Sequence, residues 1–228
     1  MAHNVFRKGG IPALAYLSLE DASSSCLCSL IVKVNEACKE ATITLQFDLP
    51  LHNFDTDQQI SLVYDADNLI PGETTLSPAK RNLLQLDQIT RRGGSNFGSL
   101  RVVLRHPCTV LCPHSSGNIA PKDSSDAHFQ QLVDLAKATR LSITFDYAWL
   151  HPDKSSQFLS LTNSSALTGF SRNSTTALLR ETDWTVFSPG DPVSPEAPPA
   201  YEHASLKRSR QCKCLDVHLM FSHCVDAW

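Results

Sequence analysis

The sequence lacks several features that would place it in a membrane, outside the cell or on nucleic acid. No run of about 18 apolar residues is present, so no membrane-spanning helix is predicted. The first residues do not combine a basic stretch with an uninterrupted apolar segment, which is the pattern of a secretory signal. A formal net charge of −3 provides no overall basic field for phosphate backbones. We therefore expect an intracellular protein, cytoplasmic or nuclear and not secreted, with no membrane contact and no strong nucleic-acid signal.

No motif in the sequence carries a specific catalytic or cofactor chemistry. The chain has eight cysteines, but at 228 residues and without a predicted signal these are expected to be reduced thiols rather than disulfides. Hydrophobic residues make up 42% of the chain, which is enough to fill a sizeable core. We therefore expect one globular domain, and the lack of a catalytic signature makes an enzyme the less favoured function class.

Alternating apolar residues predict strands in the first part of the chain. Residues 13–19 are a short apolar stretch, which we assign to an edge strand. Residues 30–34 and 43–49 alternate on either side of a polar turn, which predicts a β-hairpin with one buried and one solvated face. A further strand is expected from Ile60, ending at the turn-forming residues 65–68.

A short helix is predicted after these strands. Ser77-Pro78 looks like a helix start, because proline is favoured in the first helical position. Leu83 and Leu86 continue at helical spacing, and glycines at 93–94 stop the pattern.

Residues 100–147 show the clearest secondary structure. Residues 100–104 predict a strand buried on both faces. A helix is expected to begin near 123–125, and its apolar residues Phe129, Leu132, Val133 and Ala136 recur at helical spacing. Residues 141–147 alternate and predict a strand with a polar reverse face. Strand, helix and strand fit a right-handed crossover as well as an antiparallel arrangement.

Together these elements predict an α+β or α/β fold, with a mixed β-sheet and a few packed helices. We assign residues 1–12 to a flexible N-terminus and residues 13–187 to a single globular domain. From residue 188 the chain is rich in proline and poor in apolar residues, so it cannot offset its own ordering entropy. Residues 188–228 are therefore predicted to be a disordered tail.

The tail contains a short motif with a known recognition mode. Pro198, Pro199 and Tyr201 match the PPxY pattern that aromatic grooves of WW domains bind as a polyproline II helix. The alternative is a chance tyrosine in a Pro-rich linker. The motif predicts a WW-domain protein as the partner, and the basic cluster at 207–210 is either an import patch or solubilising charge.

Several short segments are unusual in combination. They are His106-Pro107-Cys108, Leu111-Cys112-Pro113, FDYAWLH at 145–151, DWTVFSP at 183–189, PPAY at 198–201 and KRSR at 207–210. With this set the chain resembles uncharacterised predicted proteins from filamentous fungi. The resemblance implies a shared ancestry and no activity, cofactor or catalytic residue. The chain departs from the set after Cys212, where such proteins continue into a longer polar tail.

Cys108 and Cys112, flanked by His106 and His114, are candidate metal ligands. Zinc prefers thiolate and imidazole donors, and a structural site takes four of them. A Cys-x3-Cys spacing fits such sites, but a histidine two residues from each cysteine is unusual. The alternative is that both cysteines are small buried residues at a Pro-bounded turn. Histidines in reach would also activate a nucleophilic cysteine. Zinc is the one cofactor that the sequence leaves open.

A third hypothesis is an enzyme with a cleft at the strand ends. Asp65, Asp67 and Asp146, with His151, supply carboxylates and an imidazole of the kind that act as general bases. The alternative is structural, because Asp65 and Asp67 are turn formers and Asp146 falls on the polar face of an alternating strand.

Overall fold

A computed structural model describes residues 3–4, 9–17, 25–79, 85–91, 96–115, 117–150, 166–170 and 179–187. The chain divides into two units, and all of these residues belong to the first, Met1–Gly190. The predicted tail, 188–228, lies outside the described residues, as do His151 and the apolar stretch that follows it.

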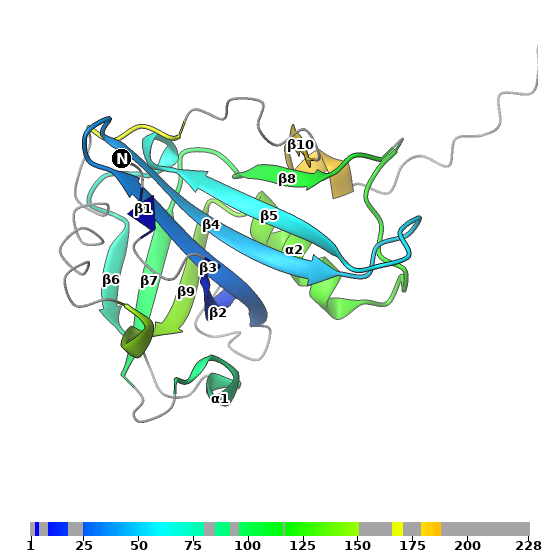
Figure 1. The fold of residues 1–228 in the computed structure, drawn as a ribbon, viewed down its shortest axis with the longest axis horizontal. Coiled ribbons are helices and arrows are strands. Elements are labelled where there is room, and N and C mark those ends of the chain that lie inside the picture. Colours follow the sequence, from blue (N-terminus) through cyan, green and yellow to red (C-terminus); the bar gives the residue numbers. More distant parts are fainter. Residues whose placement is uncertain are drawn as a thin grey trace, which may run out of the picture. The chain divides into compact units, whose positions relative to one another are not determined.

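Ten strands in this part of the chain form one sheet (Figure 1). They are β1 (His3–Asn4), β2 (Ile11–Tyr16), β3 (Cys26–Asn35), β4 (Glu40–Leu49), β5 (Gln58–Asp65), β6 (Thr75–Pro78), β7 (Phe97–Val103), β8 (Thr109–Pro113), β9 (Arg140–Asp146) and β10 (Leu179–Thr182). Their order across the sheet is β10-β8-β5-β4-β3-β2-β9-β7-β6, with β1 on β3 beyond the end of β2. Neighbouring strands are antiparallel throughout, so the expectation of a mixed sheet is wrong. The described part of the chain is mostly one large antiparallel sheet with few helices, which agrees only in part with the expected α+β class.

The predicted hairpin is confirmed, and it lies in the middle of the sheet. β3 and β4 pair from Asn35↔Glu40 to Ser29↔Gln46, so that Leu30 faces Leu45. Alternate residues of both strands are buried, as a period-two pattern requires. Figure 1 shows these two strands and β5 side by side.

Of the two arrangements left open for residues 100–104 and 141–147, the structure has the antiparallel one and not the right-handed crossover. β7 and β9 are antiparallel neighbours, with Phe97 opposite Asp146 and Val103 opposite Arg140. After β7 the chain first forms β8, on the far side of β5, and only then α2 (Ala127–Lys137). The sequence did not predict β8, because the prolines of this segment indicate a loop and Pro113 is the last residue of that strand.

Helix α2 packs its apolar side against the sheet and η5 (Trp184–Phe187), as its spacing predicts. Phe129, Leu132, Val133 and Ala136 are all buried. The N-cap is Asp126, just after the expected start. Its carboxylate accepts hydrogen bonds from the backbone N–H groups of His128 and Phe129.

β2 is a central strand and not the expected edge strand, because it pairs with both β3 and β9. It begins at Ile11, and His3–Asn4 already pairs with β3, so the first twelve residues are not simply a flexible segment. A small second core covers β2 on the other face of the sheet. It consists of Leu14, Phe97 and Ile89, the last from the short helix α1 (Leu86–Ile89).

Ser77-Pro78 does not start a helix. Both residues belong to β6, an edge strand in which a missing backbone N–H is tolerated. Within the described residues, α1 is the only helical turn of the segment predicted as a helix.

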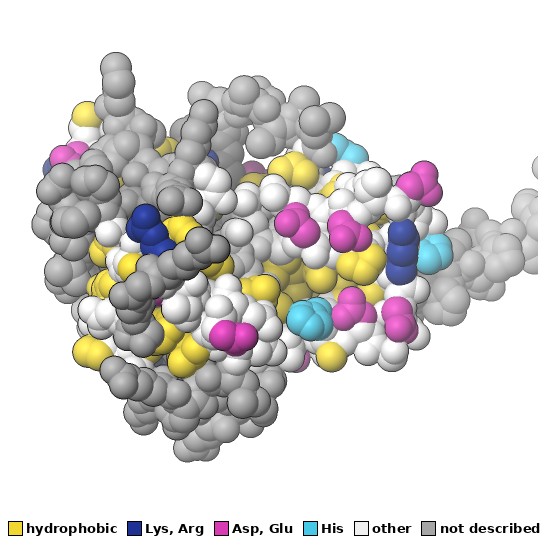
Figure 2. All heavy atoms as spheres, turned by 60° about the horizontal axis from the view of Figure 1, so that its bottom comes forward, with side chains coloured by type: hydrophobic (Ala, Val, Ile, Leu, Met, Phe, Trp, Pro, Cys, Tyr) yellow, Lys and Arg dark blue, Asp and Glu magenta, His cyan; other side chains and the backbone are white. Residues whose placement is uncertain are grey.

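The surface is mixed in charge, as the small net charge of the chain implies. On the face shown in Figure 2, acidic side chains and histidines alternate with small apolar areas, and Lys and Arg side chains do not gather into a large patch. No helix in the described part of the chain is both long and apolar enough to cross a membrane.

Candidate functional site

The chain leaves the sheet at the end of β5 and forms a turn there, which hydrogen bonds hold to the segment after β7. After Asp65 it turns through the 3-10 helix η2 (Ala66–Asn68). The Asn68 side chain donates to the His106 carbonyl oxygen at 3.0 Å and accepts from the His106 N–H at 3.0 Å. The Arg105 N–H donates to the Asn68 carbonyl oxygen at 2.9 Å. These hydrogen bonds, each with a backbone atom as a partner, hold the turn after β5 to the segment after β7.

Residues 166–170, which we call the strap, lie beside β4 at the point where β5 ends. Thr168 forms an isolated parallel bridge with Glu40. The Ala41 N–H donates to the Thr168 carbonyl oxygen, and the Thr168 N–H to the Lys39 carbonyl oxygen, both at 2.9 Å. The strap therefore hydrogen-bonds to backbone groups at the start of β4, which do not pair with β5.

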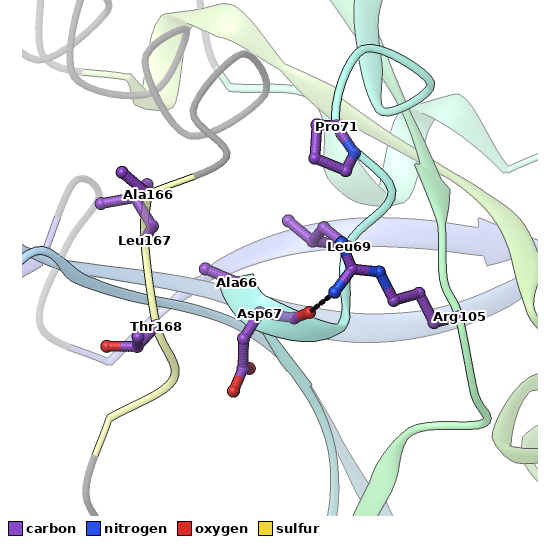
Figure 3. Close-up of a pocket in the computed structure, with 8 residues that line it drawn as sticks. All are labelled: Ala66, Asp67, Leu69, Pro71, Arg105, Ala166, Leu167 and Thr168. Atoms are coloured by element: carbon purple, nitrogen blue, oxygen red, sulfur yellow. Dashed lines mark hydrogen bonds between the residues drawn. The ribbon is translucent and has the colours of Figure 1, made fainter.

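Two hollows lie between the strap, the turn and the start of β8. The first, which we call the strap pocket, has a volume of about 210 Å³ and is lined by Ala66, Asp67, Leu69, Pro71, Arg105, Ala166, Leu167 and Thr168 (Figure 3). The second, the outer pocket, has a volume of about 330 Å³ and is lined by Val63, Asp65, Asp67, Asn68, Arg105, His106, Pro107 and Thr109. Asp67 and Arg105 line both.

Among the described residues that line the strap pocket, Arg105 is the one with a cationic side chain. Its guanidinium donates through Nη1 to the Asp67 carbonyl oxygen at 3.0 Å, the bond that is dashed in Figure 3. The Asp67 carboxylate points away from the guanidinium in the same view. Within the described residues Arg105 has no carboxylate partner.

The structure does not bring the four predicted zinc ligands together. Cys108 and Cys112 point into the core, whereas His106 and His114 are exposed. Among the described residues no three His, Cys, Asp or Glu side chains form a group that could hold a metal ion. Cys112 lies on the buried side of β8 and Cys108 is buried directly before it, whereas both histidines lie outside that strand, where its alternation does not orient them.

Burial also opposes a nucleophilic role for either cysteine. Cys108 donates through Sγ to the Ala136 carbonyl oxygen at 3.7 Å, and burial raises its pKa to about 12. Burial raises the pKa of Cys112 as well, partly offset by Arg180. A reactive cysteine needs a lowered pKa, so these thiols fit the interpretation as small buried residues.

The Asp146 side chain accepts hydrogen bonds from the backbone. It is fully buried, and its two oxygens accept from the N–H groups of Arg91 and Ala148, each at 2.9 Å. It thereby caps η3 (Tyr147–Trp149) and fixes the chain after α1. Trp149 continues this contact by donating through Nε1 to the Ile89 carbonyl oxygen at 3.2 Å.

The other members of the predicted acidic set do not join Asp146. Asp65 accepts from the Thr42 hydroxyl at 3.0 Å on the outer pocket, and Asp67 lies on η2. His151 is outside the described residues, and so are Pro198, Pro199 and Tyr201.

Sequence reasoning missed Arg105, Leu69 and the strap as parts of one site. The strap pocket joins three segments separated by more than thirty residues each, and no local pattern links them. The one local signal was the position of Arg105, directly before the His106-Pro107 segment that the sequence singled out.

No family model, curated protein or solved structure matches the chain. The resemblance to filamentous-fungal proteins therefore stays a prediction.

Proposed function

We propose that this protein is an interaction protein that presents a linear motif to WW domains. The observation that carries the proposal is the sequence Pro198-Pro199-Ala200-Tyr201, which has both prolines and the tyrosine that such domains bind. The proline pair favours the polyproline II conformation before binding, which lowers the ordering cost.

The position of the motif supports the proposal. The first unit ends at Gly190, and the motif begins eight residues later in the second unit, Asp191–Trp228. A WW domain reaches only a few residues of an extended peptide, so a motif outside the first unit does not require part of the sheet to open.

The test is calorimetric titration of the full chain against a panel of WW domains. We expect at least one domain to bind, and Tyr201→Ala to weaken that binding by more than roughly tenfold, because an aromatic anchor dominates such small interfaces. Pro195→Ala is the matched control, since it changes a nearby proline outside the motif. Absence of binding to every domain, or equal binding by the Tyr201→Ala variant, would disprove the proposal.

A further inference from the structure

We propose that the strap pocket binds a small organic monocarboxylate with a compact apolar or aromatic body. This inference is independent of the WW-domain motif. It rests on the lining of the pocket, the setting of Arg105 and the volume enclosed by the strap.

The lining is mixed in polarity. Ala66, Leu69, Pro71, Ala166 and Leu167 contribute carbon to it, and the polar side chains are those of Asp67, Arg105 and Thr168. Figure 3 shows the strap on one side and Leu69, Pro71 and Arg105 on the other. The Thr168 hydroxyl is engaged with the Lys39 carbonyl oxygen, at 3.5 Å. Small-molecule sites have this composition, with an apolar wall and a few polar groups that set the orientation.

Arg105 is held in place as an anion anchor. Its backbone N–H is bonded to Asn68 and its Nη1 to the Asp67 carbonyl oxygen, so that two points of this exposed residue are held. No other N–H of this guanidinium bonds to a described residue. A planar guanidinium with free donors pairs best with a carboxylate, through two parallel hydrogen bonds.

The size of the pocket limits the body of the ligand. A cavity of about 150 Å³ is known to hold benzene. The strap pocket, at about 210 Å³, therefore has room for one ring or a short branched chain together with a carboxylate. Benzoate is a suitable probe.

The acidic residues near Arg105 favour a single negative charge. Asp67 lines the strap pocket as well as the outer pocket, and Asp65 lines the outer pocket. A second negative charge on the ligand would meet these carboxylates, and unscreened like charges at short distance are unfavourable. We therefore expect benzoate to bind more tightly than phthalate or inorganic phosphate.

The test is titration of the ¹⁵N-labelled full chain with benzoate, followed by backbone amide shifts. We expect saturable shifts at Ala66, Leu69 and Leu167, which line the pocket. Benzamide, which has the same ring and no charge, is expected to bind roughly 10- to 100-fold more weakly because it lacks the charge-assisted hydrogen bonds.

Two variants distinguish a loss of ligand binding at Arg105 from a loss of folding. Arg105→Gln is expected to lose the preference for benzoate over benzamide, whereas Arg101→Gln, an exposed arginine on β7 outside both pockets, is expected to keep it. Should Arg105→Gln not fold, Leu167→Trp provides a second variant, because a larger side chain on the strap fills the hollow and abolishes binding. No saturable shift with benzoate, shifts centred elsewhere, or equal affinity for benzamide would overturn the proposal.

Discussion

Two carboxylates, of which Asp146 is fully buried, bond to backbone N–H groups, each at the start of a helical turn. Asp126 caps α2, and Asp146 caps η3 while also holding the N–H of Arg91. Asp146 is fully buried and each of its oxygens already accepts a backbone hydrogen bond, so a substrate does not reach it. At the residue scale, Asp146 therefore stabilises the fold.

Replacing Asp146 tests this role. Asp146→Ala leaves the N–H groups of Arg91 and Ala148 without their acceptor, so we expect the free energy of unfolding to fall by about 2 kcal/mol. Asp146→Asn keeps one acceptor oxygen and should lose less. Urea denaturation measures both, with the exposed Asp57→Ala as control. A stability unchanged by Asp146→Ala would contradict a structural role.

The buried thiols predict a loss of stability at alkaline pH. Burial raises the pKa values of Cys108 and Cys26 to about 12, from an ordinary value of 9.0. The folded state therefore keeps protons that the unfolded state releases, so this stabilisation is complete below pH 9 and is lost as the pH rises toward 12. The free energy of unfolding, measured by urea denaturation, should fall over this range.

A single cysteine variant isolates this contribution. Cys108→Ala removes one of the raised pKa values, so its stability should decline less steeply between pH 9 and 12 than that of the wild type. The exposed Cys38→Ala is the matched control and should follow the wild type. Identical slopes for all three proteins would contradict the assignment.

At the scale of elements, local periodicity predicted what depends on neighbours in sequence. The β3–β4 hairpin needs only a short turn, and α2 needs only a spacing of three and four residues, so both were predicted correctly. The central position of β2 depends on its pairing with β9, about 130 residues away, and no local pattern encodes that pairing.

The same limit applies to the candidate site. Cys108 and His106 are two residues apart and were candidate ligands of one zinc site, with buried cysteines as the alternative, and the fold places a buried thiol beside an exposed imidazole. The strap pocket was missed because Leu167 and Leu69, which both line it, lie far apart in the sequence. Closeness in sequence thus suggested a zinc site whose residues the fold does not bring together.

The strap itself has a testable attachment point. A Cβ atom on Gly169 would lie 2.6 Å from Asp65 Cγ, closer than real Cβ contacts allow. Gly169→Ala must therefore displace the strap or Asp65, and the bond from the Ala41 N–H to Thr168 should open more often. We expect amide hydrogen exchange at Ala41 to accelerate roughly tenfold, as an opening easier by about 1.4 kcal/mol implies.

Gly117→Ala is the matched control for the strap variant, because nothing lies within 4 Å of a Cβ at that position. Exchange at Ala41 should be unchanged in it. Equal exchange rates in the Gly169→Ala and Gly117→Ala variants would show that the strap does not depend on the close approach of Gly169 to Asp65.

At the scale of the whole molecule, the last described element closes the core. In η5, Val186 and Phe187 are buried, and Phe187 meets Phe129 of α2 edge to face at 5.7 Å between ring centroids. β10 pairs with β8 at the edge of the sheet just before it. The core therefore includes residues up to Phe187, three residues before the first unit ends at Gly190.

Two truncations test where the folded unit ends. A chain cut after Gly190 keeps every buried residue named above, so we expect its thermal midpoint to match that of the full chain while WW-domain binding is lost. A chain cut after residue 178 loses β10, Val186 and Phe187, and the two side chains alone contribute about 3–6 kcal/mol of burial. That loss is a large part of the stability of an ordinary domain, so the shorter chain should melt far lower or fail to fold.

Equal midpoints for the two truncations would mean that η5 does not close the core. A lowered midpoint for the cut after Gly190 would mean that the second unit contributes to the fold as well as carrying the motif.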